Sequence, residues 1–364
     1  MHLTLVIPSL ACGGVERVVA TMANYWAACN HKVTVLTFDD GGEPPFFPLS
    51  SNVRHIPLAL NRDSSNAAKA LRNNFRLIRT LRSCIHNSHP DIVISFLTRT
   101  NVRTLLAAFG LNVPVIVSER ADPKIENPGR IWKLLRRLTY RSASGIVAHT
   151  RASAAYLSQL LKLEVADIPN PVCVTSEAHR SPTPGKPTIV AAGRLEPEKG
   201  FDVLLESFSR VAHDIEGLTL RIFGDGAERT KLESLRSQLG LDSRVSLPGQ
   251  TREISSALDE ATLFIAPSRF EGFGNSICEA MARGIPVIAS DCSGPREIIT
   301  PGTDGVLVPI EDVEALAAEM ARLLIDIEER QRLGNAASQI RNRFSLESVM
   351  DRWDALITRC TTAQ

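Results

Sequence analysis

The stretch ATLFIAPSRFEGFGNSICEAMARGIPVIAS, residues 261–290, decides the fold class. An apolar, strand-like run at 261–268 is followed by a loop with two glycines, a helical pattern at 274–283 and a second apolar run at 285–290. Two strands connected by a helix lie parallel in one sheet, because the helix carries the chain back to the edge where the first strand began. Continuous apolar strands also indicate a sheet that is covered on both faces. The segment therefore predicts an α/β domain.

The same alternation continues in both directions from this segment. In the second half, further strand-like runs occupy 187–193, 218–224, 244–249 and 305–309, with helical patterns at 201–214, 227–239 and 312–334. In the first half, strands are predicted at 3–8, 32–38, 91–97, 114–119 and 145–150, with helices near 14–30, 66–86, 99–109, 129–142 and 151–161. The pattern predicts two tandem Rossmann-like domains, each a doubly wound parallel sheet, that face one another across a cleft.

The segment between the halves marks the domain boundary. Residues 173–186 lie in a stretch rich in Pro, Ser and Thr, which predicts a linker between a first domain at 1–172 and a second at 187–343. Residues 344–364 predict an amphipathic helix with Ser345 as its N-cap, which packs on either domain. The apolar face of this helix comprises Leu346, Met350, Trp353, Leu356 and Ile357.

The two halves carry opposite net charge. The chain of 364 residues has a formal net charge of +1, yet residues 1–172 hold nine more Lys and Arg than Asp and Glu, and residues 173–364 hold eight fewer. Such asymmetry indicates that the halves meet different partners. A basic half suits an anionic membrane surface or nucleic acid.

Cysteine usage and hydropathy bear on the compartment. The seven cysteines are scattered, odd in number and without C-x-x-C spacing, which argues against a disulfide framework or a zinc ribbon. The start of the sequence lacks the basic region of a signal peptide. No apolar run reaches the roughly 18 residues of a membrane-spanning helix. We therefore expect a cytoplasmic protein, peripheral at the inner face of the membrane.

Two glutamates frame the helix of the opening segment. Glu271 precedes the helix and Glu279 lies within it, while Gly272 and Gly274 stand at its start. Backbone N–H groups and the dipole at such a start suit a phosphate or a sugar hydroxyl. Glu279 lies among apolar residues, and a buried carboxylate needs a partner, such as the hydroxyls of a ribose. The residues alone leave an alternative equally open, in which one glutamate complements the helix dipole and the other is a solvated side chain on the helix.

The turn GRLEPEKG, residues 193–200, follows the first strand of the second half. Arg194 and Lys199 flank its proline and are placed to clamp a diphosphate, whose charge such cations stabilise as it leaves. A turn with two solvated cations is the alternative that the residues alone favour.

Other strand ends carry further candidates. Gly14 follows the first strand and permits close approach of the backbone to an anion. Gly249 ends a strand where it can lie along a base. Arg120, in SERADP, and His149 end two further strands and are candidates for acceptor binding or acid–base catalysis. An ordinary turn or an exposed loop is the alternative for each.

Two helices of the first half are basic and amphipathic. In residues 130–141, Ile131, Leu134, Leu135 and Leu138 share one face, and Arg130, Lys133, Arg137 and Arg141 line the other. In residues 71–82, Arg72, Arg76 and Arg79 follow one another at helical spacing. Such a helix either covers a core with a solvated basic face or lies on anionic lipid. Two of them in a basic half favour lipid, with Arg136, Arg137 and Arg141 as contacts.

Taken together, these segments resemble a known family. The tandem halves, GGVE at 13–16, GRLEPEKG at 193–200 and EGFGNSICEAMARGIPVIAS at 271–290 are similar to the GT-B glycosyltransferases of family GT4, a retaining, metal-independent group with an E-x7-E motif. The resemblance covers nearly the whole chain, and it implies that the final helix, in 344–364, crosses back to the N-terminal domain. The sequence also lacks the D-x-D motif of the metal-chelating transferases of the other common nucleotide-sugar fold.

The resemblance implies a role for each matched residue. As catalytic residues it implies Arg194, Lys199 and Glu271, with Arg120 standing where many members have a histidine. For donor binding it implies Arg194 and Lys199 at the diphosphate and Glu279 at the ribose. It places Glu271, Phe273, Gly274 and Asn275 at the donor sugar and the α-phosphate, and it lets Gly14 approach the donor from the first domain. We add Gly249, which ends a strand, to the expected donor-binding residues.

The implied reaction transfers a sugar from a nucleoside diphosphate sugar, expected to be a UDP-sugar, to a hydroxyl with retention of configuration. The expected acceptor is a lipid-linked or growing saccharide in polysaccharide or glycan biosynthesis. We expect no cofactor, because the nucleotide sugar is a co-substrate. We also expect no metal ion and no nucleic-acid partner. The alternatives are a nucleotide-sugar epimerase of the same fold and a non-catalytic sugar-nucleotide-binding protein.

Overall fold

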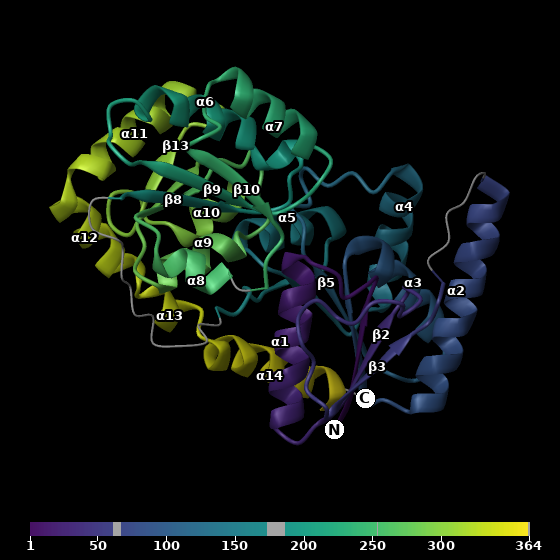
Figure 1. Cartoon of the computed structure of the whole chain (residues 1–364). Helices are drawn as coiled ribbons and strands as arrows, with labels where there is room; N and C mark the ends of the chain where they lie inside the picture. The colour runs from purple at the N-terminus through teal and green to yellow at the C-terminus, as the bar shows by residue number, and fades with distance from the viewer. Residues whose placement is uncertain (61–66, 173–185, 253, 363–364) are drawn as a thin grey trace. The chain divides into compact units, whose positions relative to one another are not determined.

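The computed structural model describes residues 1–60, 67–172, 186–252 and 254–362. The chain divides into two compact units (Figure 1). The first unit comprises Met1–Pro169 and Val349–Gln364, and the second unit comprises Asn170–Ser348.

The first unit contains a parallel sheet with helices packed against it. Its strands are β1 (His2–Ile7), β2 (Lys32–Thr37), β3 (Val53–Pro57), β4 (Ile92–Phe96), β5 (Val115–Glu119), β6 (Gly145–Ala148) and β7 (Ala166–Asp167). Its helices are α1 (Gly14–Ala28), α2 (Ala67–Ser88), α3 (Thr98–Ala108), α4 (Arg130–Thr139), the 3-10 turn η1 (Tyr140–Ser142) and α5 (Arg151–Leu161). The strand order is β3-β2-β1-β4-β5-β6-β7, so the direction of winding reverses between β1 and β4.

The second unit repeats this plan. Its strands are β8 (Thr188–Ala192), β9 (Thr219–Phe223), β10 (Val245–Gly249), β11 (Leu263–Ala266), β12 (Val287–Ser290) and β13 (Val306–Val308), in the order β10-β9-β8-β11-β12-β13. Its helices are η2 (Pro197–Lys199), α6 (Phe201–Val211), α7 (Arg229–Gln238), α8 (Ile254–Asp259), α9 (Asn275–Ala282), α10 (Ser293–Ile298), α11 (Val313–Ile325), α12 (Ile327–Ala337) and α13 (Ile340–Arg343). Winding reverses between β8 and β11.

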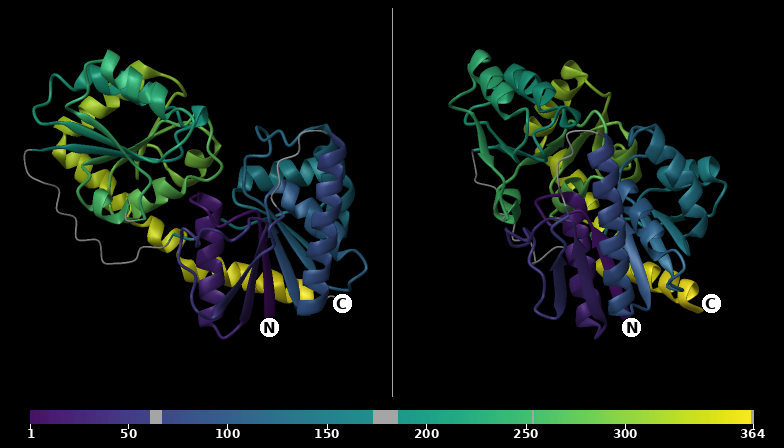
Figure 2. Two further views of the ribbon diagram at one scale, coloured as in Figure 1. Left: turned by 45° about the vertical axis from the view of Figure 1, so that its right-hand side comes forward. Right: turned by 90° about the vertical axis from the view of Figure 1, so that its right-hand side faces the viewer.

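The predicted fold class is confirmed, because each paired strand in both sheets is parallel and helices cover both faces (Figure 2). β8 shows how the two-sided core arises. Successive side chains of a strand point to opposite faces. Ile189 therefore lies in the apolar cluster beneath α6 and α11, and Val190 lies in the cluster beneath α9 and α13.

The last helix, α14 (Leu346–Thr362), begins in the second unit and packs on the first. Ser345 caps it, since the Ser348 N–H donates to the Ser345 Oγ at 3.1 Å. The fully buried Trp353 meets the edge of Trp26 at 6.4 Å between ring centroids. The Trp26 Nε1–H donates to Asp354 at 2.7 Å. Aromatic packing and one hydrogen bond therefore fix α14 against α1.

Several details differ from the sequence prediction. The helix expected at 312–334 is two helices, because Asp326 ends α11 and caps α12 by accepting the Glu329 N–H at 2.9 Å. β3 was not predicted, since this edge strand is half exposed and has no continuous apolar run. The two-residue β7 and the short helices α8, α10 and α13 were also missed. Nearly all of the predicted linker, residues 173–185, lies outside the described residues.

Candidate functional site

The carboxyl edge of the second unit's sheet brings distant segments together. β8 and β11 are neighbours where the winding reverses, and the turn 193–200 follows β8 while the loop 267–274 follows β11. In doubly wound sheets, ligands bind in the crevice outside the strands at this switch point. We therefore build the candidate site from these two segments and the start of α9.

Lys199 and Glu271 form an ion pair between the two segments. The Lys199 Nζ donates to the Glu271 Oε2, and the two side chains are 18% and 17% exposed. Ser268 Oγ donates to the same carboxylate at 3.4 Å. An ammonium group has three donors and a carboxylate accepts several hydrogen bonds, so both retain capacity for a ligand. The pair offers a cation for phosphate and an acceptor for sugar hydroxyls.

Arg269, which the sequence analysis did not single out, fixes the loop that carries Glu271. Its guanidinium binds both carboxylate oxygens of Asp202, at 3.0 and 2.8 Å, and its backbone N–H donates to the Glu198 carbonyl at 2.8 Å. Burial alone would raise the pKa of the Asp202 carboxyl, but the hydrogen bonds and charge of Arg269 outweigh it and lower that pKa. The clamp holds the loop after β11 against the turn that carries Lys199.

The backbone of Glu271 is tied to α10. Its carbonyl oxygen accepts the Gly294 N–H at 3.1 Å and the Ser293 Oγ–H at 3.2 Å. Burial, followed by the charge of Glu271, raises the pKa of the neighbouring Cys292 thiol to about 12. Since the thiolate is the reactive form, this cysteine is inert at neutral pH.

Two glycines at this edge permit contacts that any other residue would block. Gly200 has φ +65°, and a Cβ there would lie 2.1 Å from the Pro267 carbonyl oxygen. Gly224 has φ +144°, and a Cβ there would lie 1.8 Å from the Gly193 carbonyl oxygen. The loops after β8, β9 and β11 therefore pack backbone against backbone, which positions the site.

The helix α9 begins a few residues after Glu271, and its N-cap residue is a glycine. Gly274 is the N-cap residue, with φ +104° and no side-chain cap, so the first turn offers backbone N–H groups to an anion. The Asn275 Oδ1 accepts from Asn170 at 2.7 Å, and the Ser276 Oγ–H donates to the carbonyl of Ala192 at 3.3 Å. Phe273 is buried, and its ring packs against Phe344.

The remaining residues predicted to bind the sugar donor differ in burial and in their contacts. Glu279 is buried on α9, as its apolar neighbours indicated. Arg194 is 64% exposed and pairs with Glu198 at 2.9 Å, so Arg194 and Lys199 engage different carboxylates. Gly249 has φ +93°, and its carbonyl accepts the Gly224 N–H at 2.9 Å, which places it beside the loop after β9.

Arg229 is a second residue that the sequence analysis missed. Its guanidinium donates to the carbonyls of Gly224 at 3.0 Å and Leu247 at 3.2 Å, and pairs with Asp225. It thereby ties the loop after β9 to β10. A signal was present in the sequence, because Asp225, Arg229 and Glu233 follow one another at the spacing of helical ion pairs.

The predicted residues of the first unit lie at the carboxyl ends of β1, β5 and β6. Gly14 is exposed and opens α1. Arg120 is buried, with its guanidinium over the rings of Phe96 and Trp353 at 5.5 and 5.6 Å. Burial lowers its pKa to about 9, which leaves it protonated at neutral pH. His149 is buried, with its Nδ1 3.0 Å from the carbonyl oxygen of Glu119.

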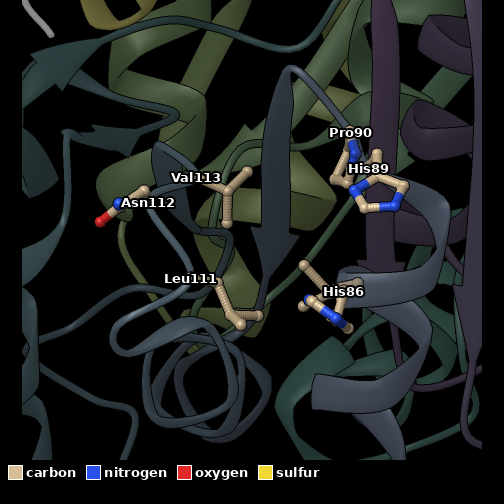
Figure 3. A pocket seen from close by; sticks show the side chains of 7 residues that line it. His86, His89, Pro90, Leu111, Asn112 and Val113 are labelled. Carbon is tan, nitrogen blue, oxygen red and sulfur yellow. The ribbon is translucent and has the colours of Figure 1, made fainter.

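A cavity of about 190 Å³ lies at the opposite edge of this sheet, between the end of α2 and the segments that precede β4 and β5 (Figure 3). His86, His89 and Asn112 line it. The amino ends of parallel strands are not where doubly wound folds bind substrates. The cavity is therefore separate from the candidate site.

Two family models match the chain. The model described as "Glycosyltransferase Family 4" matches residues 12–175, and the model described as "Glycosyl transferases group 1" matches residues 175–340. Among the described residues, no helix is long and apolar enough to cross a membrane.

Curated relatives carry glycosyltransferase names. A Campylobacter jejuni protein is 28% identical over 100% of both chains, and is named as an alpha-1,4-N-acetyl-D-galactosaminyltransferase acting on a GalNAc-GalNAc-diNAcBac-PP-undecaprenol. The lipopolysaccharide core biosynthesis glycosyltransferase LpsE of Rhizobium meliloti is 27% identical over 81% of this chain and 86% of its own.

Solved structures share the fold over the whole chain. Sucrose-phosphate synthase from Thermosynechococcus elongatus has a TM-score of 0.87 at 20% identity and covers 100% of both chains. Anabaena Alr3699/HepE in complex with UDP and glucose has a TM-score of 0.79 at 19% identity, covering 98% of this chain and 99% of its own.

The two parallel-sheet units and these matches define a glycosyltransferase of the GT-B fold. Within that fold the chain resembles the GT4-like enzymes, since its first half matches the family 4 model and its second half, which carries the motifs at 193–200 and 271–290, matches the group 1 model.

Proposed function

We propose that the protein transfers a sugar from a nucleoside diphosphate sugar, most simply a UDP-sugar, to a hydroxyl of a lipid-linked or growing saccharide, with retention of anomeric configuration and without a metal ion. The observation that carries the proposal is the Lys199–Glu271 pair at the switch point, next in sequence to the glycine-capped start of α9. The pair supplies charge for a diphosphate and hydrogen-bond acceptors for a sugar within one small region.

In the proposed reaction, the acceptor oxygen forms a bond to the anomeric carbon as the bond from that carbon to the diphosphate oxygen breaks. The hydroxyl proton passes to the departing phosphate oxygen. Lys199 and the N–H groups of α9 stabilise the charge that builds on the diphosphate. Glu271, already paired with Lys199, orients sugar hydroxyls rather than attacking carbon, which favours a same-face displacement.

Names of related proteins support the donor and acceptor classes. The Campylobacter jejuni relative is named for an undecaprenol-linked saccharide, and structures of Anabaena Alr3699/HepE contain UDP or UDP-glucose.

Arg194 is proposed as a second diphosphate ligand, because its surface ion pair with Glu198 contributes little stability and is readily exchanged for a ligand. Glu279 is proposed as the ribose ligand. Arg120 is proposed as a residue on the acceptor side of the site. It would act indirectly, by holding the end of β5 against α14.

The basic first half is proposed to contact an anionic membrane from the cytoplasmic side, where a lipid-linked acceptor would lie. On α4, Ile131, Leu134 and Leu138 are 73%, 58% and 58% exposed. Arg136 is 3% exposed, and its Nη1 lies 3.8 Å from the buried carboxylate of Glu119, so the expectation that Arg136 contacts lipid is wrong. Neither an epimerase nor a non-catalytic binding protein is favoured, because the family models and the Campylobacter jejuni and Rhizobium meliloti relatives are named as glycosyltransferases.

A donor panel tests the proposal. Purified protein is incubated with UDP-, GDP-, ADP- and TDP-sugars, and slow release of free sugar is followed by NMR, which also reports the anomeric configuration first formed. We expect hydrolysis of one donor class with retained configuration. Release of an inverted sugar would contradict the retaining mechanism. Stable binding of a donor without turnover, alone or with an undecaprenol-linked acceptor, would favour the non-catalytic alternative.

A further inference from the structure

The chain enters the second unit through a buried asparagine. Asn170 is the first residue of that unit, is 6% exposed and stands between Pro169 and Pro171. The ring of Pro171 restricts the residue before it to extended backbone conformations. A side-chain amide is stable in a buried position only where it forms hydrogen bonds. The sequence therefore fixes the backbone of Asn170, and its side chain needs a polar partner.

That partner is the first residue of α9. The Asn170 Nδ2 donates to the Asn275 Oδ1 at 2.7 Å, although the two residues are 105 positions apart in the sequence. Asn275 directly follows the N-cap residue Gly274 and is one of the residues expected at the α-phosphate of the donor. The hydrogen bond therefore joins the segment through which the chain enters the second unit to the proposed diphosphate site.

The entry segment, residues 170–172, is itself held in place. The Val172 N–H donates to the Phe344 carbonyl at 2.8 Å, and Val172 forms a parallel bridge with Ser345, shortly before the chain returns to the first unit. The Phe344 ring packs against Phe273, with the ring centroids 5.5 Å apart. The entry segment and the residues at 344–345 thus lie side by side, and both contact the region where α9 begins.

The start of α9 is also tied to the sheet. The Ser276 Oγ–H donates at 3.3 Å to the carbonyl of Ala192, the last residue of β8. With the helix start anchored there, the bond from Asn170 decides which end of the Asn275 amide is used for that bond and which end is presented elsewhere. The difference matters at a phosphate, because phosphate oxygens accept hydrogen bonds from N–H groups and repel a carbonyl oxygen.

We propose that Asn170 is a positioning residue for sugar transfer: by donating to the Asn275 Oδ1, it holds the Asn275 amide with its N–H groups toward the donor diphosphate. An amide turned the other way would direct its carbonyl oxygen at the phosphate. Asn170 acts through Asn275 and not by contact with the substrate. The inference rests on the proposed function, because it needs a diphosphate at the start of α9. It adds a role for Asn170, which the sequence analysis did not single out.

Reversing the hydrogen bond tests the proposal. Asn170→Asp keeps the size of the side chain, but an ionised carboxylate only accepts hydrogen bonds, so the Asn275 amide must turn round to reach it. Asn170→Ala removes the bond without reversing it. The matched control is Asn335→Asp, the same chemical change at an exposed position on α12. Isothermal titration calorimetry with UDP, GDP, ADP and TDP measures binding to each full-length variant, and melting temperatures report folding.

We expect wild type and Asn335→Asp to bind one nucleotide equally, and Asn170→Asp to bind it at least about tenfold more weakly, because an attractive contact with phosphate becomes repulsive. Asn170→Ala should lose only about twofold to threefold, since a fraction of its molecules still present the N–H end of Asn275. Lowering the pH should reduce the deficit of Asn170→Asp relative to wild type, because a protonated carboxyl donates as the amide does.

A second background shows whether Asn170 acts through Asn275. In Asn275→Ala, the change Asn170→Asp should cost little further affinity, because no amide remains to turn. If Asn170→Asp does not fold, Asn170→Ala replaces it in this comparison, and its cost should likewise vanish in the Asn275→Ala background.

Three outcomes would overturn the inference and leave the proposed function in place: wild-type affinity of Asn170→Asp, a deficit that is independent of pH, or the same deficit with and without the Asn275 side chain. The last result would mean that the new charge acts on the nucleotide directly. A wild-type protein that binds none of the four nucleotides would instead remove the proposed function, and this role of Asn170 with it.

Discussion

The two units both place charged residues at the carboxyl ends of strands, but in different surroundings. In the second unit, Lys199 and Glu271 pair where both side chains remain partly exposed. In the first unit, Glu119 and Arg120 end β5 and are buried beneath Tyr140 and the aromatic rings of β4 and α14. Charged residues at strand ends are therefore proposed to bind a ligand in the second unit, whereas at the end of β5 they are buried in the packing of the first unit. Exposure, rather than residue type, separates the two uses.

The largest effect is expected from breaking the buried pair of the first unit. Arg136→Ala leaves the Glu119 carboxylate buried without its cation, which should lower the free energy of unfolding by about 3–5 kcal/mol. Chemical denaturation measures the change. The neighbouring Arg137→Ala is the control, since its side chain is exposed and its loss should cost less than about 0.5 kcal/mol. Equal costs for the two variants would show that the buried pair is unimportant.

The partly exposed pair of the second unit, Lys199 and Glu271, should affect turnover rather than stability. Lys199→Ala removes a cation from the proposed diphosphate site and should reduce turnover about 100-fold, with the melting temperature preserved. Lys231→Ala is the matched control, because Lys231 also pairs with a glutamate but lies on the surface of α7. Steady-state kinetics with the identified donor gives the comparison. Full activity of Lys199→Ala would remove this residue from the mechanism.

A smaller effect concerns pH. The pKa of Asp202 is lowered by Arg269, so the clamp stabilises the second unit above the ordinary carboxyl value and loses this contribution as the pH falls through the lowered value. Asp202→Asn should therefore cost about 1–2 kcal/mol at pH 7 and progressively less below about pH 4. Denaturation at several pH values checks this. A cost that is independent of pH would mean that ionisation of Asp202 contributes nothing.

The smallest effect is expected from removing metal ions. The chain contains no D-x-D motif, and the proposed site stabilises the leaving diphosphate with Lys199 and backbone N–H groups. Turnover should thus be unchanged in excess EDTA. Loss of activity that added Mg²⁺ or Mn²⁺ restores would contradict the metal-independent mechanism.

The sequence predicted most of the fold because buried parallel strands are continuous apolar runs. The strands predicted for the second unit agree with β8 to β13 to within two residues at each end. β3 was not predicted because an exposed edge strand has no continuous apolar run. The break between α11 and α12 was not predicted because a single aspartate, Asp326, ends one helix and caps the next.

The candidate site was predictable only as far as its residues follow strand ends. Lys199 and Glu271 each follow an apolar strand, and the strand order then brings them together. The sequence did not indicate that Arg269 clamps their loops, because its partner Asp202 lies in a different segment. The orientation of α4 was likewise unpredictable, since periodicity identifies an apolar face without saying whether a buried charge such as Arg136 turns it outward.

The central claim is that the switch point of the second unit binds a nucleoside diphosphate through Lys199. Isothermal titration calorimetry with UDP, GDP, ADP and TDP tests it directly on wild type, Lys199→Ala and Lys231→Ala. We predict that one nucleotide binds wild type and Lys231→Ala equally, and binds Lys199→Ala at least about tenfold more weakly, because a charge-assisted contact is lost. Equal affinity of Lys199→Ala and wild type, or no binding of any of the four nucleotides, would contradict the account.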